Sequence, residues 1–112
     1  MSIKLDRLNN SFIESISKII HNDVKDKNVK DITITDVRIT NDLSIAKVYF
    51  TSMSSDRDKI LSSLNKASGF IRSKLCEMVD IRKMPELIFV YDESIEYANK
   101  IEDIIERINN GE

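Results

Sequence analysis

The chain has 112 residues, of which 41% are hydrophobic and 32% charged, and its formal net charge is −2 at pH 7. This length accommodates one domain, so we expect residues 1–112 to fold as a single globular unit. One cysteine, Cys76, excludes an intramolecular disulfide, and one histidine excludes a multi-histidine metal site. No metal and no cofactor are therefore expected.

The sequence shows neither a membrane span nor a secretory signal. No run of about 18 apolar residues occurs, and the first ten residues lack an apolar core. We therefore expect a cytoplasmic protein with no membrane partner.

The charge is distributed unevenly along the chain. Residues 1–84 carry 15 basic and 11 acidic side chains, a sum of +4, whereas residues 85–112 carry two basic and eight acidic ones, a sum of −6. This asymmetry indicates a basic surface on the body of the domain and a separate acidic surface at its C-terminal end. The simpler alternative is a solvated acidic helix at that end.

The predicted elements begin with a helix and a strand. Apolar side chains recur every three or four positions in residues 3–23 and predict a helix, which a charged loop over residues 24–31 follows. Residues 31–40 alternate between apolar and polar side chains, and the alternation slips once near Thr35 and Asp36. A β-bulge at this slip would restore one buried face of the strand.

A hairpin is expected next. Asn41 and Asp42 suit its turn, and residues 45–52 form the second strand. Successive side chains of this second strand face opposite sides of the sheet. Three of them face the core, and the side chains that alternate with these, including Lys47 and Tyr49, face the other side.

The second half of the chain predicts helices on either side of a strand. Ser55 or Asp56 can cap a helix that carries two apolar stripes, over residues 60–67 and 70–79. We expect a kink between the stripes at Ala67, Ser68 and Gly69, where the glycine either builds a binding site or relieves crowding against the sheet.

After the kinked helix, Pro85 ends the loop, and the apolar run 86–92 predicts a central strand buried on both faces. A stripe of Ile95, Ala98, Ile101, Ile105 and Ile108 predicts a last helix that lies on the sheet. The order α-β-β-α-kink-α-β-α, with helices packed on one face of a three-stranded sheet, is an α+β fold.

The residues that could carry chemistry are basic. No glycine-rich nucleotide-binding loop and no metal-ligand spacing occur, and Cys76 among apolar neighbours predicts a buried, inert thiol. Basic side chains cluster around the kink and the loop that follows. Others lie out of phase with the apolar faces of the hairpin and are therefore expected to be exposed. Tyr49 lies beside them and could stack a base or simply lie on the sheet surface. The candidate RNA-binding residues are Arg38, Lys47, Lys66, Ser68, Gly69, Arg72, Lys74, Arg82 and Lys83.

Several short segments, taken in order, resemble the ribosome-binding factor A family. In chain order, they are DITITDVRIT at residues 31–40, AKVYF at 46–50, ASGFIRSKL at 67–75, IRKMPELIF at 81–89 and DES at 92–94. Residues 25–28 depart from the Asp-Pro-Arg that many members carry, and the longer C-terminal tail of some members is absent.

The resemblance implies a type II KH-like fold in which the kink at residues 67–69 stands where other KH domains carry their GXXG loop. It also implies a monomeric, non-enzymatic assembly factor whose partners are the free or immature 30S ribosomal subunit and its 16S rRNA. Such a factor supports 5′-end maturation of 16S rRNA and growth in the cold. The alternative is a small adaptor that contacts another protein through the acidic C-terminal helix. A hydrolase is disfavoured because the sequence offers no catalytic constellation.

Overall fold

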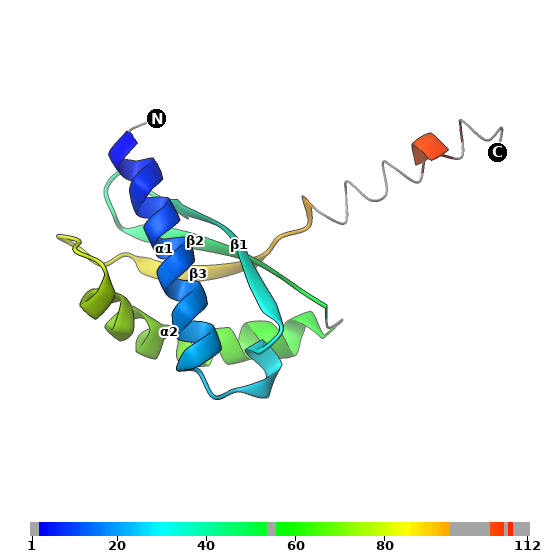
Figure 1. The fold of residues 1–112 in the computed structure, drawn as a ribbon, viewed down its shortest axis with the longest axis horizontal. Coiled ribbons are helices and arrows are strands. Elements are labelled where there is room, and N and C mark those ends of the chain that lie inside the picture. Colours follow the sequence, from blue (N-terminus) through cyan, green and yellow to red (C-terminus); the bar gives the residue numbers. More distant parts are fainter. Residues whose placement is uncertain (1–2, 54–55, 95–103, 107, 109–112) are drawn as a thin grey trace.

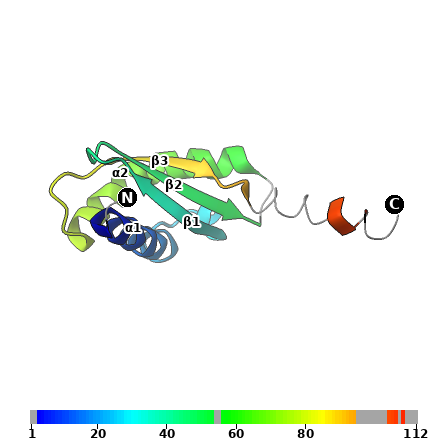
Figure 2. The same cartoon turned by 90° about the horizontal axis from the view of Figure 1, so that it is seen from above.

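A computed structural model of the chain describes residues 3–53, 56–94, 104–106 and 108. Its elements are α1 (Ile3–Asn22), the short 3-10 helix η1 (Lys27–Val29), β1 (Ile32–Ile39), β2 (Ile45–Ser52), α2 (Arg57–Met78) and β3 (Glu86–Tyr91). Both α-helices pack on the same face of the three-stranded sheet, as Figures 1 and 2 show from two directions. The predicted α+β fold is thus confirmed. No helix in the described ranges is long and apolar enough to cross a membrane.

The bulge predicted from the slip in β1 is present. β1 pairs antiparallel with β2, and their register shifts between Ile34 and Asp36. Because the shift compensates for the change of parity, the apolar side chains on both sides of it lie in the core. They are Ile32, Ile34, Val37 and Ile39.

The prediction of a central, doubly buried third strand is wrong. The strand order is β1-β2-β3, so β2 is central and β3 is an edge strand that pairs in parallel with β2. Leu87 and Phe89 are buried, whereas Ile88 between them is 38% exposed. The apolar run in β3 is continuous although Ile88 lies on the sheet face that the described helices leave uncovered.

The segment predicted as a charged loop contains an ordered turn. Asp26 caps η1 by accepting a hydrogen bond from the backbone N–H of Asn28 at 2.9 Å. Asn28 in turn donates through Nδ2 to Ser63 Oγ on α2 at 3.2 Å, and Val29 is fully buried. The buried Val29 and one hydrogen bond to Ser63 therefore hold this basic segment against the body of the domain, and the Asp26 cap orders the turn itself.

α2 is one helix rather than two. Asp56 is its N-cap and accepts a hydrogen bond from the backbone N–H of Lys59, and every residue from Arg57 to Met78 is helical. Figures 1 and 2 show that its green and yellow-green halves run in different directions, so the helix bends without breaking. A glycine costs a helix interior only about 1 kcal/mol, which is too little to interrupt a helix packed on both sides of it. A kink that broke the helix would expose backbone N–H groups at a second helix start, and the continuous helix α2 has no such start.

Three side chains of the second apolar stripe are wrongly placed by the prediction. Phe70 is 44% and Met78 47% exposed, and Cys76, which we expected to be buried, is exposed as well. The buried positions of this half of the helix are Ile71 and Leu75. Ile71 and Leu75 are four positions apart and share the buried face of the helix, whereas Phe70 lies beside that face.

The predicted C-terminal cover is wrong at the two positions of its stripe that the structure describes. Ile105 is 50% and Ile108 69% exposed, so neither packs in the core. Ile95, Ala98 and Ile101 lie outside the described residues.

Candidate nucleic-acid interface

A groove of about 600 Å³ lies between α2 and the segment that enters β3. It brings together four predicted RNA-binding residues from two distant parts of the chain, namely Ser68, Gly69, Arg72 and Lys83. The other lining residues are Ser44, Asn65, Met84 and Glu86. The groove thus joins one flank of α2, the end of the β1–β2 turn and the loop before β3.

Gly69 leaves open space on the surface of α2. It lies inside the helix, and a Cβ added at this position would meet nothing within 4 Å, once its chain neighbours and the nearby helix backbone are set aside. The alternative that Gly69 relieves crowding against the sheet is therefore wrong. Neither packing nor a left-handed backbone requires glycine here, so its presence at the groove allows a ligand to approach the helix backbone closely.

Arg72 connects the two walls of the groove. Its Nε donates to the carbonyl oxygen of Pro85 and its Nη2 to that of Met84, each at 3.1 Å. These bonds join α2 to the residues immediately before β3. The RNA contact predicted for Arg72 remains a prediction. The sequence gave no sign of its structural role, because backbone acceptors leave no pattern in a sequence.

The turn that borders the groove is held by hydrogen bonds to a carboxyl group with a lowered pKa. Asp42 Oδ1 accepts hydrogen bonds from Ser44 Oγ at 2.7 Å, from Thr40 Oγ1 at 2.7 Å and from the Ser44 backbone N–H at 3.1 Å. These bonds, and to a lesser degree the charge of nearby Lys83, lower the pKa of Asp42 to about 2. Leu43 completes the turn in the left-handed conformation, with φ of 60°.

We expect the stability of the turn to depend on pH through Asp42. Its pKa falls from 3.8 to about 2 on folding, so its contribution to stability is present above pH 3.8 and is lost as the pH falls through about 2. A carboxyl-detected NMR titration should place the Asp42 midpoint near 2. Acid unfolding of Asp42→Asn should lack this component, whereas a midpoint near 3.8 in the native protein would show that the three bonds do not form in solution.

Two predicted residues of α2 lie on a different flank from the groove. Lys66 is exposed, and its charge contributes to the lowered pKa of Asp26 beside η1, for which the Asn28 N–H is the main cause. Lys74 places its Nζ 5.8 Å from the centroid of the Phe70 ring. Neither lysine lines the groove. Arg82 is exposed in the loop next to Lys83.

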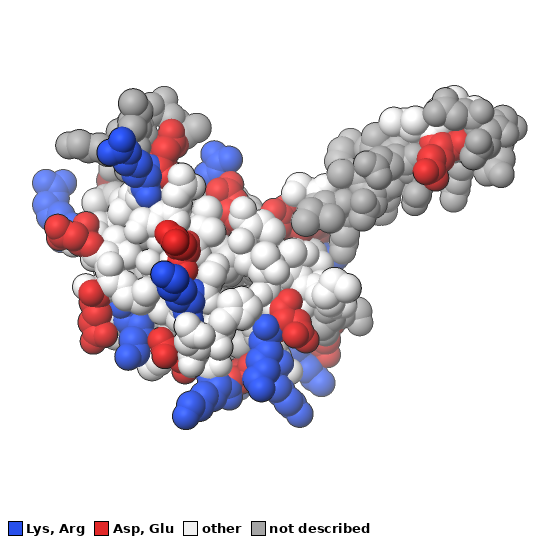
Figure 3. Space-filling view, viewed as in Figure 1, with Lys and Arg blue, Asp and Glu red and all other residues white. Residues whose placement is uncertain are grey.

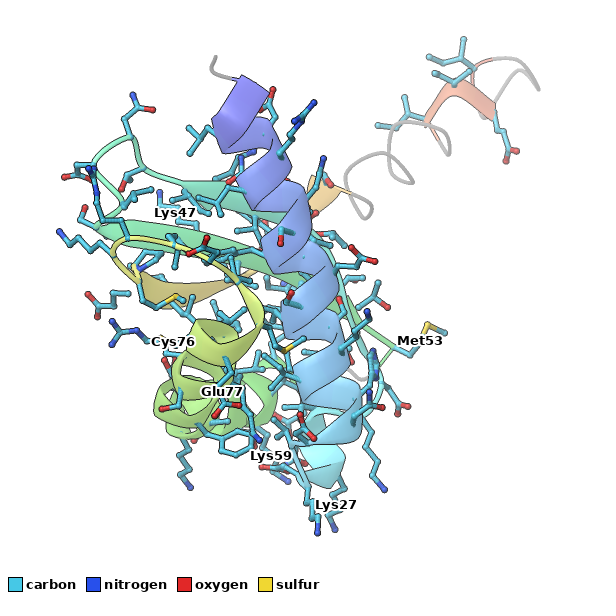
Figure 4. All side chains as sticks on the ribbon, turned by 60° about the vertical axis from the view of Figure 1, so that its left-hand side comes forward. Lys27, Lys47, Met53, Lys59, Cys76 and Glu77 are labelled. Carbon is cyan, nitrogen blue, oxygen red and sulfur yellow. The ribbon has the colours of Figure 1, made fainter. Side chains whose placement is uncertain are left out.

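The remaining predicted residues lie on the uncovered sheet face. Arg38 and Lys47 are register partners on β1 and β2, and both are exposed. Arg38 and the half-buried Tyr49 line a second recess, of about 420 Å³, with Asp36, Asp92 and Ser94. In Figure 4, Lys47 lies on the sheet, away from Lys27 and Lys59 at the far end of the molecule.

Charge distinguishes the two recesses. The groove has two cations, Arg72 and Lys83, against one carboxylate, Glu86. The recess on the sheet has one cation, Arg38, against two carboxylates, and Arg38 Nε already donates to Asp36 Oδ2 at 2.7 Å. The lining of the groove is therefore the more basic of the two. Among the residues that the structure describes, no group of three His, Cys, Asp or Glu side chains could hold a metal ion.

Comparison with known proteins identifies the family of the chain. The sequence model of the family described as ribosome-binding factor A matches residues 4–105. The chain belongs to the ribosome-binding factor A family. The ribosome-binding factor A of Staphylococcus epidermidis is 46% identical over 110 residues, an alignment that covers 96% of this chain and 95% of that protein. The protein of the same name from Staphylococcus carnosus is 44% identical over 109 residues, with coverage of 96% and 95%.

Solved structures of ribosome-binding factor A share the fold. The crystal structure of the Thermus thermophilus protein has a TM-score of 0.73 and 22% identity, and the match covers 78% of this chain and 94% of that one. A Thermus thermophilus homology model, fitted into the cryo-EM map of a complex between the 30S subunit and ribosome-binding factor A, has a TM-score of 0.62 and 21% identity, covering 84% and 97%. The described α-β-β-α-β order is accordingly a KH-like fold of type II, as the family resemblance implied.

Proposed function

We propose that this protein is a non-enzymatic assembly factor that binds the free or immature 30S ribosomal subunit through 16S rRNA. Family membership supports the class of function, and the 30S complex of the Thermus thermophilus relative supports the partner. We further propose that the whole chain acts as one monomeric, cytoplasmic RNA-binding domain. Its finer roles would be 5′-end maturation of 16S rRNA and growth in the cold.

The groove beside Gly69 is the proposed docking site, and the open space at this glycine is the observation that carries the proposal. A sugar-phosphate backbone can approach α2 at Gly69 because no side chain projects there. Lys83 supplies a cation at the opposite wall, and Ser68 supplies a hydroxyl group on the helix. Arg72 keeps the two walls at a fixed separation through its bonds to Met84 and Pro85.

Co-sedimentation with purified 30S subunits, 50S subunits and 70S ribosomes tests the proposal. We expect retention on 30S subunits alone, with an affinity that falls with salt by a logarithmic slope of about −0.7 to −0.9 for each phosphate contact. Equal retention on all three particles, or on none, would contradict the proposal. Retention on 30S subunits with almost no salt dependence would instead favour the adaptor that binds a protein.

Gly69→Ala should stabilise the protein and weaken 30S binding at the same time. Alanine in place of a helical glycine raises the free energy of unfolding by about 0.5–1 kcal/mol, because it restricts the unfolded chain and no atom near Gly69 opposes the methyl group. The same methyl group occupies the space that the RNA backbone would use. Chemical denaturation and co-sedimentation measure the two effects.

The matched control for Gly69→Ala is Ser62→Ala, at an exposed position of α2 that does not line the groove. This variant should gain a smaller stability from helix propensity and bind 30S subunits normally. If Gly69→Ala were also to bind normally while gaining stability, close approach at Gly69 would be excluded.

A further inference from the structure

An exposed aromatic ring lies between two lysines on the flank of α2 that does not line the groove. Phe70 is 44% exposed, and Lys66 and Lys74 stand one helical turn before and after it, about 6 Å along the axis in each direction. The Lys74 Nζ lies 5.8 Å from the centroid of the Phe70 ring. We call these three residues the lysine–phenylalanine face.

We propose that the lysine–phenylalanine face is a stacking platform for one unpaired base of single-stranded RNA. Any base can stack on the part of the Phe70 ring that Lys74 Nζ does not cover, since every base presents a π-face. Lys66 and Lys74 are placed to contact the phosphates on either side of that base. The inference rests on the proposed function, because it adds a second contact to the RNA that the groove would hold.

The size of the apolar patch favours RNA over protein. A stable protein interface buries about 800 Å² on each partner around an apolar centre from which lysine is depleted. Here the large apolar area is a single Phe70 ring with a lysine on each side, and the next large exposed apolar residue of α2, Met78, lies two turns farther along. One ring matches one base, whereas it is too small for the centre of a protein interface.

The surrounding charge extends this basic character toward η1. Lys66 is close enough to Asp26 to lower the pKa of that carboxyl group. Figure 3 shows Lys and Arg side chains along the lower edge of the molecule, over η1 and α2, with acidic side chains among them. In Figure 4, Lys27 and Lys59 extend from η1 and α2 at this same end. A strand that crosses Phe70 would therefore meet further cations along its path.

Substitution of Phe70 tests the stacking contact directly. Phe70→Leu keeps an apolar side chain but removes the ring, and Phe70→Tyr keeps the ring. Met78→Leu is the matched control at an exposed apolar position of the same helix. Binding is measured by fluorescence anisotropy with a short fluorescein-labelled oligoadenylate and by co-sedimentation with 30S subunits, and circular dichroism confirms that each variant is folded.

We expect Phe70→Leu to weaken oligoadenylate binding by about 5- to 150-fold, the range that one base–aromatic stack provides. Phe70→Tyr should restore binding, and Met78→Leu should match the wild type. The salt slope should stay unchanged in Phe70→Leu, whereas Lys66→Ala combined with Lys74→Ala should reduce it by about 1.4, because two single-strand phosphate contacts disappear.

Three results would overturn the stacking platform. The first is wild-type affinity of Phe70→Leu for both RNA and 30S subunits, and the second is a wild type that binds 30S subunits but not oligoadenylate. The third is normal RNA binding by Phe70→Leu with loss of 30S binding, which would assign the face to a ribosomal protein. If the wild-type protein fails to bind 30S subunits at all, it is the proposed function that fails.

Discussion

Arg72→Ala should lower the free energy of unfolding by about 2–4 kcal/mol, a large effect for a half-buried side chain. Nε and Nη2 of Arg72 donate to the carbonyl oxygens of Pro85 and Met84, and hydrogen bonds that involve a charged group contribute about 1.5–3 kcal/mol each. Alanine removes both bonds and leaves two carbonyl groups without these donors. Urea denaturation followed by circular dichroism measures the loss.

Two control variants separate geometry from charge. Arg72→Lys keeps the positive charge but cannot present two donors in the planar fork of a guanidinium group, so it should recover less than half of the lost stability. Lys74→Ala removes a cation from the same helix, outside the groove, and should change the stability by less than about 0.5 kcal/mol.

Binding data on the Arg72 variants would show whether the groove needs this connection. Because Arg72 joins α2 to the residues before β3, its loss should let the walls of the groove separate and weaken 30S binding even where the protein remains folded. A fully folded Arg72→Ala protein with wild-type stability would show that the two bonds are not made in solution, and normal binding would show that the groove does not depend on them.

The strands and the first helix were predictable because each leaves a periodic signal. The slip of alternation at Thr35 and Asp36 located the bulge, since a change of parity in a strand with one buried face has few other solutions. The same reasoning failed for β3. A continuous apolar run is typical of a strand covered on both faces, and Ile88 completes such a run although it lies on the open side of an edge strand.

The groove was predictable only in part. Basic residues beside a glycine pointed to Ser68, Gly69, Arg72 and Lys83, which the structure does bring to one place. Asp42 was predicted only as a turn residue and Ser44 was not singled out, because only the folded hairpin brings the β1–β2 turn next to the loop before β3. Their one local signal is the run of Thr40, Asn41, Asp42 and Ser44, side chains that bond to turn backbones.

The predicted basic set also lies on more than one surface; the sequence placed Arg38 and Lys47 on the hairpin but did not separate Lys66 and Lys74 from Lys83. Arg38 and Lys47 lie on the uncovered sheet face, Lys66 and Lys74 on one flank of α2, and Lys83 at the groove. Counting charges along the chain treats all of them alike. Deciding which surface meets RNA therefore requires charge changes that are matched in size but differ in position.

Lys83→Glu provides that change at the groove. We expect a tenfold to hundredfold loss of 30S affinity at about 0.1 M salt, because one phosphate contact is replaced by a repulsive one. The added carboxylate would stand near Asp42 and on the same groove as Glu86, which makes the local potential strongly negative. Stability should change little, since Lys83 is exposed.

The control is Lys47→Glu, which makes the same change of charge at an exposed position of the sheet face. If RNA docks at the groove, Lys47→Glu should bind 30S subunits within a few-fold of the wild type, and only Lys83→Glu should show a reduced salt slope. Equal losses in the two variants would mean that net charge guides association without a localised contact. A loss confined to Lys47→Glu would move the RNA site from the groove to the open face of the sheet, where Tyr49 would then be the residue placed to stack a base.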